Sequence, residues 1–134
     1  MKTTTKLFLR LAIAAGFLSA VADRFGLWPQ AQSFWGNWNN FVNYTQTLNP
    51  WLPGKMVSIL AIIVTVLEIA FAIFLLIGFK TSLFAKLSGF MLLLFALAMT
   101  YSLGIKAPLD YSVYIASGAA FALSTLKEKY LEIG

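Results

Sequence analysis

The chain has 134 residues, of which 60% are hydrophobic and only 11% charged, whereas soluble domains carry about 25% charged residues. It contains neither cysteine nor histidine, which excludes disulfides, thiol redox chemistry, Cys/His zinc sites and histidine-ligated haem carried by this chain. The net charge of +5 comes from basic residues scattered singly beside apolar runs, so we exclude a nucleic-acid groove. The composition predicts an integral membrane protein.

Four apolar segments approach the roughly 20 residues that a helix needs to cross a bilayer. They cover about Leu7–Phe25, Met56–Gly78, Ser82–Leu103 and Pro108–Leu126. The last three are joined by tight turns, which force neighbouring helices to run antiparallel. The sequence therefore predicts an all-α fold, an up-down four-helix membrane bundle, in one domain that covers residues 1–134.

The first segment has an alternative interpretation. Ala20-Val21-Ala22 before Asp23 resembles a signal-peptidase site that follows an apolar stretch. Arg10 and the run to Phe25 fit a retained span, and removal would leave three helices, so we favour retention. Small residues at Ala12, Gly16 and Ala20 allow close packing in lipid; we expect internal packing, with contact in a homo-oligomer as the alternative.

The one long connection, from Gly26 to Gly54, holds all four tryptophans. We expect an amphipathic helix over about residues 33–48, capped by Ser33, that lies in the outer membrane interface. Its apolar face combines residues at helical spacing: Phe34, Trp38, Phe41, Thr45 and Leu48. It serves either as an aromatic belt that sets depth or as a lid over a cavity between the helices.

Lysine and arginine near the helix ends predict the orientation. One side holds Lys2, Lys6, Arg10, Lys80, Lys86, Lys127 and Lys129, and the other holds Arg24, Lys55 and Lys106. We therefore expect both termini on the cytoplasmic side.

Glu68 lies ten positions before the turn at Gly78, about 15 Å along the helix and close to the bilayer midplane. An ionised acid there costs roughly 2.5–3.5 kcal/mol, so it should face the bundle interior. We expect Arg10 as its partner, because antiparallel packing leaves an axial gap of roughly 9 Å. Snorkelling of Arg10 to the inner surface is the alternative.

A second polar group gathers at the outer end, where Asp23 and Arg24 close the first span and Lys106 and Asp110 flank the start of the fourth. Asp110 suits the first turn of a helix, where a carboxylate meets free N–H groups, and Tyr101 suits an interface anchor. Our ligand-binding candidates are Arg10, Glu68, Trp38, Tyr101 and Asp110, with Glu68 as the candidate for catalytic proton exchange.

Several short motifs, in this order, resemble the DoxX family of small four-helix membrane proteins. They are Arg10-Leu11 with Gly16, Leu67-Glu68-Ile69 leading to Leu75-Leu76-Ile77-Gly78, and Ala107-Pro108-Leu109-Asp110-Tyr111-Ser112. The resemblance covers essentially the whole chain and carries Arg10 and Glu68 over as the buried polar pair. Family members usually have a lone basic residue near the end of the first span, where this chain has Asp23-Arg24.

The resemblance implies a subunit of, or partner to, a membrane oxidoreductase in a bacterial inner membrane. The expected ligand is a quinone or a similar apolar small molecule beside the Arg/Glu pair, with electrons supplied by a partner subunit because the chain has no evident redox centre. Two other hypotheses stay open: a small-metabolite or proton transporter, as a homodimer, and a ligand-free structural subunit.

Overall fold

A computed structural model describes residues 1–134 as an all-α protein without strands. Three helices are long and apolar enough to cross a membrane, and a fourth apolar helix is shorter. The helices are α1 (Lys2–Arg24), α2 (Trp38–Leu48), α3 (Gly54–Ile77), α4 (Thr81–Leu103), α5 (Lys106–Asp110) and α6 (Val113–Ser124). The chain is a small helical membrane protein.

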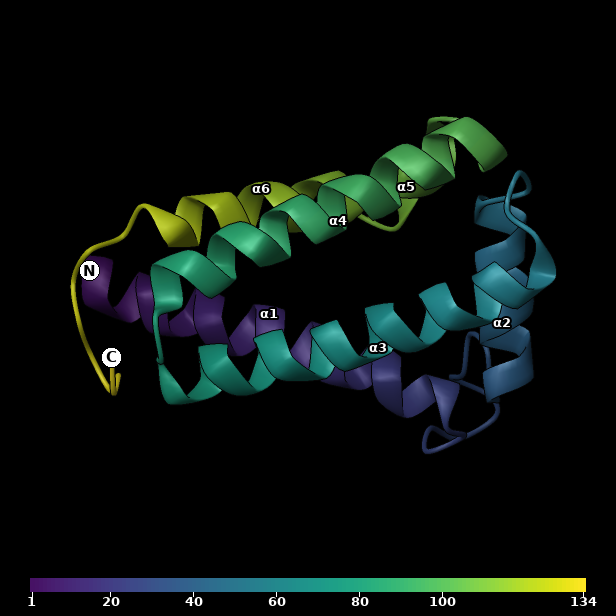
Figure 1. Cartoon of the computed structure of the whole chain (residues 1–134). Coiled ribbons are helices and arrows are strands. Elements are labelled where there is room, and N and C mark those ends of the chain that lie inside the picture. The colour runs from purple at the N-terminus through teal and green to yellow at the C-terminus, as the bar shows by residue number, and fades with distance from the viewer.

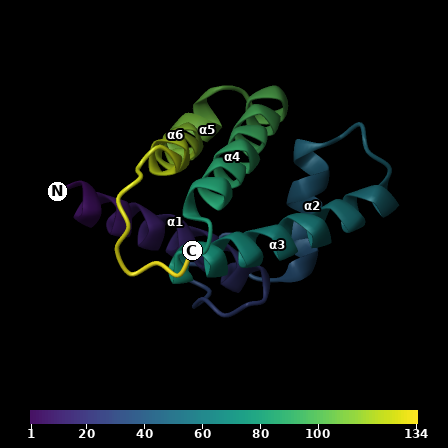
Figure 2. The same cartoon turned by 60° about the vertical axis from the view of Figure 1, so that its left-hand side comes forward.

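The helices associate as two pairs. α1 packs along α3 and α4 packs along α6, while α3 and α4 are joined by a tight turn (Figure 1). Gly78 ends α3 in the left-handed conformation, with φ of 73°, which glycine adopts without a Cβ penalty. Both termini and this turn lie at one end, the terminal end, and α2 lies across the other, the α2 end (Figures 1 and 2).

Small residues bring the pairs into contact. Ala14, Ala72, Ala85 and Ala120, one from each of the four apolar helices, are fully buried in a single hydrophobic cluster. Such residues let helix backbones approach where lipid removes the usual drive for burial. The expected internal packing of Ala12 and Gly16 is wrong, because both are exposed on the outer face of α1.

The fourth apolar segment is not one continuous helix, as we expected over Pro108–Leu126. It divides into α5 and α6 at Ser112, whose φ of 58° is left-handed, and α6 ends at Ser124. The 12 residues of α6 span about 18 Å, less than a bilayer core of about 30 Å. α5 and α6 must therefore be taken together to approach the length of a span.

After α6 the chain runs back across the terminal end as an extended segment, residues 126–134, which we call the tail (Figure 2). The amides of Ile133 and Gly134 donate to the carbonyls of Ile77 and Gly78, each at 3.2 Å. The tail thus covers the C-terminal end of α3.

The loop helix begins later than expected. α2 starts at Trp38, and its N-cap is Asn37 rather than Ser33, because the Asn37 side chain accepts a 2.8 Å hydrogen bond from the amide of Asn40. Residues 33–36 instead form a turn that is tied to α1. Ser102 of α4 donates to the carbonyl of Leu48 at 2.8 Å, which anchors the other end of α2 to the second helix pair.

Candidate functional site

The most polar buried group joins the end of α1 to the middle of α3. Arg24 and Glu68 are each only 2% exposed. The Nη2 of Arg24 donates to Oε1 of Glu68 at 3.0 Å, and its Nη1 lies 2.9 Å from Oε2. The same Nη1 donates to the hydroxyl of Thr65 at 2.9 Å, and that hydroxyl donates to the carbonyl of Ala61 at 2.8 Å. A fork of this kind holds the carboxylate in a defined orientation.

The expected partner of Glu68 is therefore wrong: Arg24, not Arg10, makes the pair. Glu68 lies nine residues before the end of α3 at Ile77, about 14 Å along the helix. Arg10 is equally buried, at 1% exposed, but it lies near that end. There its Nε donates to the carbonyl of Leu75 at 2.9 Å and its Nη2 to the carbonyl of Leu76 at 3.0 Å.

Helix ends explain where Arg10 goes. The last four carbonyls of a helix lack partners within it, so the end of α3 offers a strong acceptor site. The tail adds the carbonyls of Tyr130 and Leu131, at 2.8 and 2.9 Å, and the carboxylate of Glu132 at 3.9 Å. Arg10 thus closes the terminal end of the bundle.

Arg24 was missed because we assigned its charge to topology at the end of the first span. The spacing of Arg24 from the other residues of α1 does indicate that its side chain is buried. Arg10, Phe17 and Arg24 are seven residues apart, two helical turns, and so share one face of α1. That face is buried throughout, which directs the Arg24 side chain inward.

Asp23 organises the turn that covers the pair. Its Oδ2 accepts hydrogen bonds from the amides of Phe34 at 2.8 Å and Trp35 at 3.0 Å, and its Oδ1 accepts one from Gly36 at 3.2 Å. Three convergent amides around a carboxylate stabilise its charged form. The adjacent acid and base at the end of α1 have separate roles: Asp23 holds the turn, and Arg24 holds Glu68.

Aromatic rings cover the Arg24 guanidinium. Its central carbon lies 3.8 Å from the ring centre of Phe41 and 5.1 Å from that of Trp35, within the range of cation–π attraction. Trp38 packs against Phe41, and Phe25 stacks on Trp38 at 5.7 Å. We call Phe25, Trp35, Trp38 and Phe41 the aromatic cap. Two of its rings, Phe41 and Trp35, lie over the Arg24 guanidinium, and the other two pack behind Phe41.

Tyr44 borders this group, with its ring 5.8 Å from that of Trp35. Burial, with a smaller contribution from neighbouring Tyr111, raises the pKa of the Tyr44 phenol above its usual value. The phenol therefore stays neutral at physiological pH, and adds no charge beside the cap.

Three buried polar atoms at this site have no hydrogen-bond partner in the protein: Nε of Arg24, Nε1 of Trp35 and Oε2 of Glu68. The last lies close to Nη1 of Arg24 but outside hydrogen-bonding geometry. Buried polar groups are rarely left unpaired, because each costs roughly 1–3 kcal/mol. Arg24 and Trp35 thus each keep one buried donor without a protein partner, while Oε2 of Glu68 meets its counter-charge in Arg24.

The other candidate residues make no hydrogen bond or ion pair with Glu68. Trp38 belongs to the aromatic cap. Tyr101 is 79% exposed. Asp110 does not lie in the first turn of a long helix but ends α5, where it pairs with Lys106 at 2.5 Å on the surface. Arg10 is at the terminal end.

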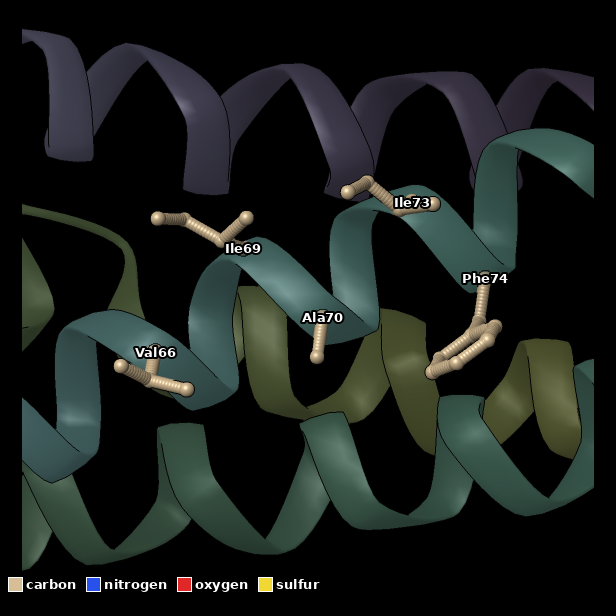
Figure 3. Close-up of a pocket in the computed structure, with 5 residues that line it drawn as sticks. All are labelled: Val66, Ile69, Ala70, Ile73 and Phe74. Atoms are coloured by element: carbon tan, nitrogen blue, oxygen red, sulfur yellow. The ribbon is translucent and has the colours of Figure 1, made fainter.

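An apolar groove of about 320 Å³ lies on α3, lined by Val66, Ile69, Ala70, Ile73 and Phe74 (Figure 3). All five residues come from that helix, and Phe74 stacks on Phe84 of α4 at 4.4 Å. At 100° per residue these positions are turned away from Glu68. The groove is therefore separate from the ion pair.

Comparison of the chain with protein-family models, with curated proteins and with solved structures finds no match to any of them. The site also holds no group of three or more acidic side chains that could bind a metal ion. Its chemistry rests on a buried arginine–glutamate pair, the threonine beside it and the aromatic cap.

Proposed function

We propose that this chain is a DoxX-like subunit of a membrane oxidoreductase system and binds a quinone, or a similar apolar ring with polar oxygens, at the Arg24–Glu68 pair. One observation carries the proposal: two buried donors beside the ion pair, Nε of Arg24 and Nε1 of Trp35, have no partner in the protein. Ligand sites combine apolar walls with a few convergent polar groups of this kind.

The two free donors suit the oxygen atoms of a quinone ring, and the aromatic cap offers faces on which the ring can stack. Glu68, ionised beside Arg24, is placed to accept one proton from a ring oxygen when a quinol is oxidised. The second proton goes to water and both electrons go to a partner oxidoreductase subunit, and reduction of the quinone runs the same transfers in reverse. In this arrangement Arg24 orients Glu68 and supports its charged form.

The bundle is four antiparallel spans, with α5 and α6 forming the last one, and α2 lies in the outer interface as a lid. The terminal end collects most of the basic residues, which supports a cytoplasmic position for both termini in a bacterial inner membrane. The ion pair then lies nearer the outer face than the predicted Arg10 pair, and α2 would have to move for a ligand to enter.

The test is mass spectrometry of solvent extracts from protein purified in mild detergent, together with quenching of tryptophan fluorescence by a short-chain quinone. We expect about one quinone per chain in the parent protein. Glu68→Gln keeps the size of the side chain but removes its exchangeable charge, and should lower quinone affinity about ten-fold, the equivalent of one polar contact.

Asp110→Asn is the matched control, since it makes the same change from carboxylate to amide in an exposed pair, and it should retain quinone like the parent. Equal amounts of quinone in all three proteins would contradict the proposed position of the site. No quinone in any of the three would contradict the proposed ligand. In the second case, proton or solute flux in liposomes would favour the transporter, and no flux would favour the structural subunit.

A further inference from the structure

The terminal end carries a second polar site that the quinone proposal does not use. A cavity of about 530 Å³ opens between the start of α4, the end of α6 and the tail. Five lysines line it: Lys6, Lys80, Lys86, Lys127 and Lys129. These are half of the ten basic residues in the chain, and they come from three separate stretches of sequence: α1, the start of α4 and the tail.

The charges in this cavity are poorly balanced. Glu132 is the one acidic side chain that lines it, and it is already paired with Lys6 at 2.8 Å. Lys80, Lys86, Lys127 and Lys129 make no ion pair. Four cations converge on one cavity without a counter-charge, which favours an anionic occupant.

The start of α4 adds donors to the same cavity. Thr81, Ser82 and Leu83 line it, and their amides, at the first turn of the helix, make no backbone hydrogen bond. Lys80 at the N-cap position offers no side-chain cap. Free amides and the helix dipole at this end attract a phosphate group. The lysines and the amides therefore point to the same ligand chemistry.

A stripe of exposed apolar residues leads away from the cavity along α4. Leu83 lines the cavity, and Leu87, Phe90 and Leu94 follow at helical spacing, all exposed. An acyl chain that lies on this stripe would place its headgroup among the lysines. We propose that the cavity is a binding site for the phosphate headgroup of one anionic membrane phospholipid, with its acyl chain along α4.

Basic pockets beside transmembrane helices are typical sites for anionic headgroups, and each lysine near the membrane surface contributes about five-fold in affinity. The test is native mass spectrometry of the full chain, released from nanodiscs that contain phosphatidylglycerol in phosphatidylcholine. We expect one phosphatidylglycerol retained per chain and no phosphatidylcholine. Glycerol phosphate, added as a free anion, tests whether the headgroup alone is sufficient, and we expect it to displace the lipid only at much higher concentration.

Two kinds of variant separate a site from general surface attraction. Lys80→Gln and Lys86→Gln should each lower retention about five-fold, while Lys2→Gln, at the same end but outside the cavity, should leave it unchanged. Ser82→Phe keeps every charge but fills the cavity, and should also abolish retention. Equal losses in Lys2→Gln and Lys86→Gln, or full retention in Ser82→Phe, would overturn the proposal.

Discussion

Two arginines on the same face of α1 are buried to the same degree, and yet they are used in different ways. Arg10 donates four hydrogen bonds, all of them to backbone carbonyls of α3 and the tail. Arg24 donates to two side chains, Thr65 and Glu68, and its Nε has no partner. The Arg10 guanidinium uses nearly all of its donors on main-chain carbonyls. The Arg24 guanidinium bonds to side chains and keeps one donor without a partner.

The difference separates architecture from a candidate site. Every helix has free backbone carbonyls at its C-terminal end, whatever its sequence. A residue that donates hydrogen bonds to them therefore stabilises the fold. Side-chain partners are chosen by the sequence, and an unpaired donor in a buried site costs stability. That cost is explained if the free donor serves a ligand. Arg10 therefore holds the tail at the terminal end, and Arg24 at the α2 end keeps one donor without a protein partner.

The largest effect should come from breaking the ion pair on one side only. Arg24→Met leaves Glu68 buried without a counter-charge, which should cost about 3–5 kcal/mol of unfolding free energy. The double variant Arg24→Met with Glu68→Leu removes both charges and should recover most of that loss, since replacement of a buried pair by apolar residues is often neutral. Unfolding of both variants in mixed micelles measures the two values. A double variant as unstable as the single one would show that the pair itself stabilises the fold.

Arg10→Lys tests the saturated arginine. A lysine has three donors on a compact ammonium and cannot span carbonyls in two segments as the planar guanidinium does. We expect a loss of about 3 kcal/mol and faster hydrogen exchange at the amides of Ile133 and Gly134, which hold the tail to α3. The exchange of the α2 amides should not change. Unchanged protection of the tail would mean that its own backbone hydrogen bonds hold it in place.

Much of this architecture follows from the sequence, because apolar length and the cost of a buried acid are local properties. The long apolar runs predict α1, α3 and α4, and the position of Glu68 predicts its burial. Its partner was missed because a charge at the end of a span has two physical outcomes, surface exposure or burial, and hydropathy does not separate them. The seven-residue spacing from Phe17 to Arg24 does separate these two outcomes, because it places Arg24 on the same buried face of α1.

The rest could not be predicted, for reasons that also concern individual residues. The tail is held by backbone hydrogen bonds and by Arg10, and neither produces a periodic pattern in residues 126–134. The break between α5 and α6 falls at Ser112, with no glycine at the left-handed position and therefore no signal that a turn is required. The turn at residues 33–36 depends on Asp23, which is more than ten residues away in the chain.

Asp23→Asn asks whether the turn that carries Trp35 is held by charge. The amide keeps one acceptor oxygen but presents N–H groups where the carboxylate accepted a hydrogen bond. We expect a loss of about 2 kcal/mol, together with faster hydrogen exchange at Phe34–Gly36. Asp110→Asn is the control, since its pair with Lys106 is exposed and such pairs contribute under about 1 kcal/mol. Similar losses in the two variants would argue against a special role for Asp23.

Thr65→Val makes the smallest and most discriminating change. Valine has nearly the shape of threonine, so packing is kept while Arg24 loses one acceptor at 2.9 Å. We expect about 1 kcal/mol of destabilisation, the usual contribution of one hydrogen bond.

Thr100→Val, which removes a comparable 2.8 Å contact to Tyr114 at a site without ion pairs, should lose a similar amount. The two variants should differ in quinone affinity, because only Thr65 orients the guanidinium that faces the proposed ligand. If quinone affinity stays at the parent value in Thr65→Val, Arg24 acts only as the counter-charge of Glu68, and the two buried arginines of α1 are both structural.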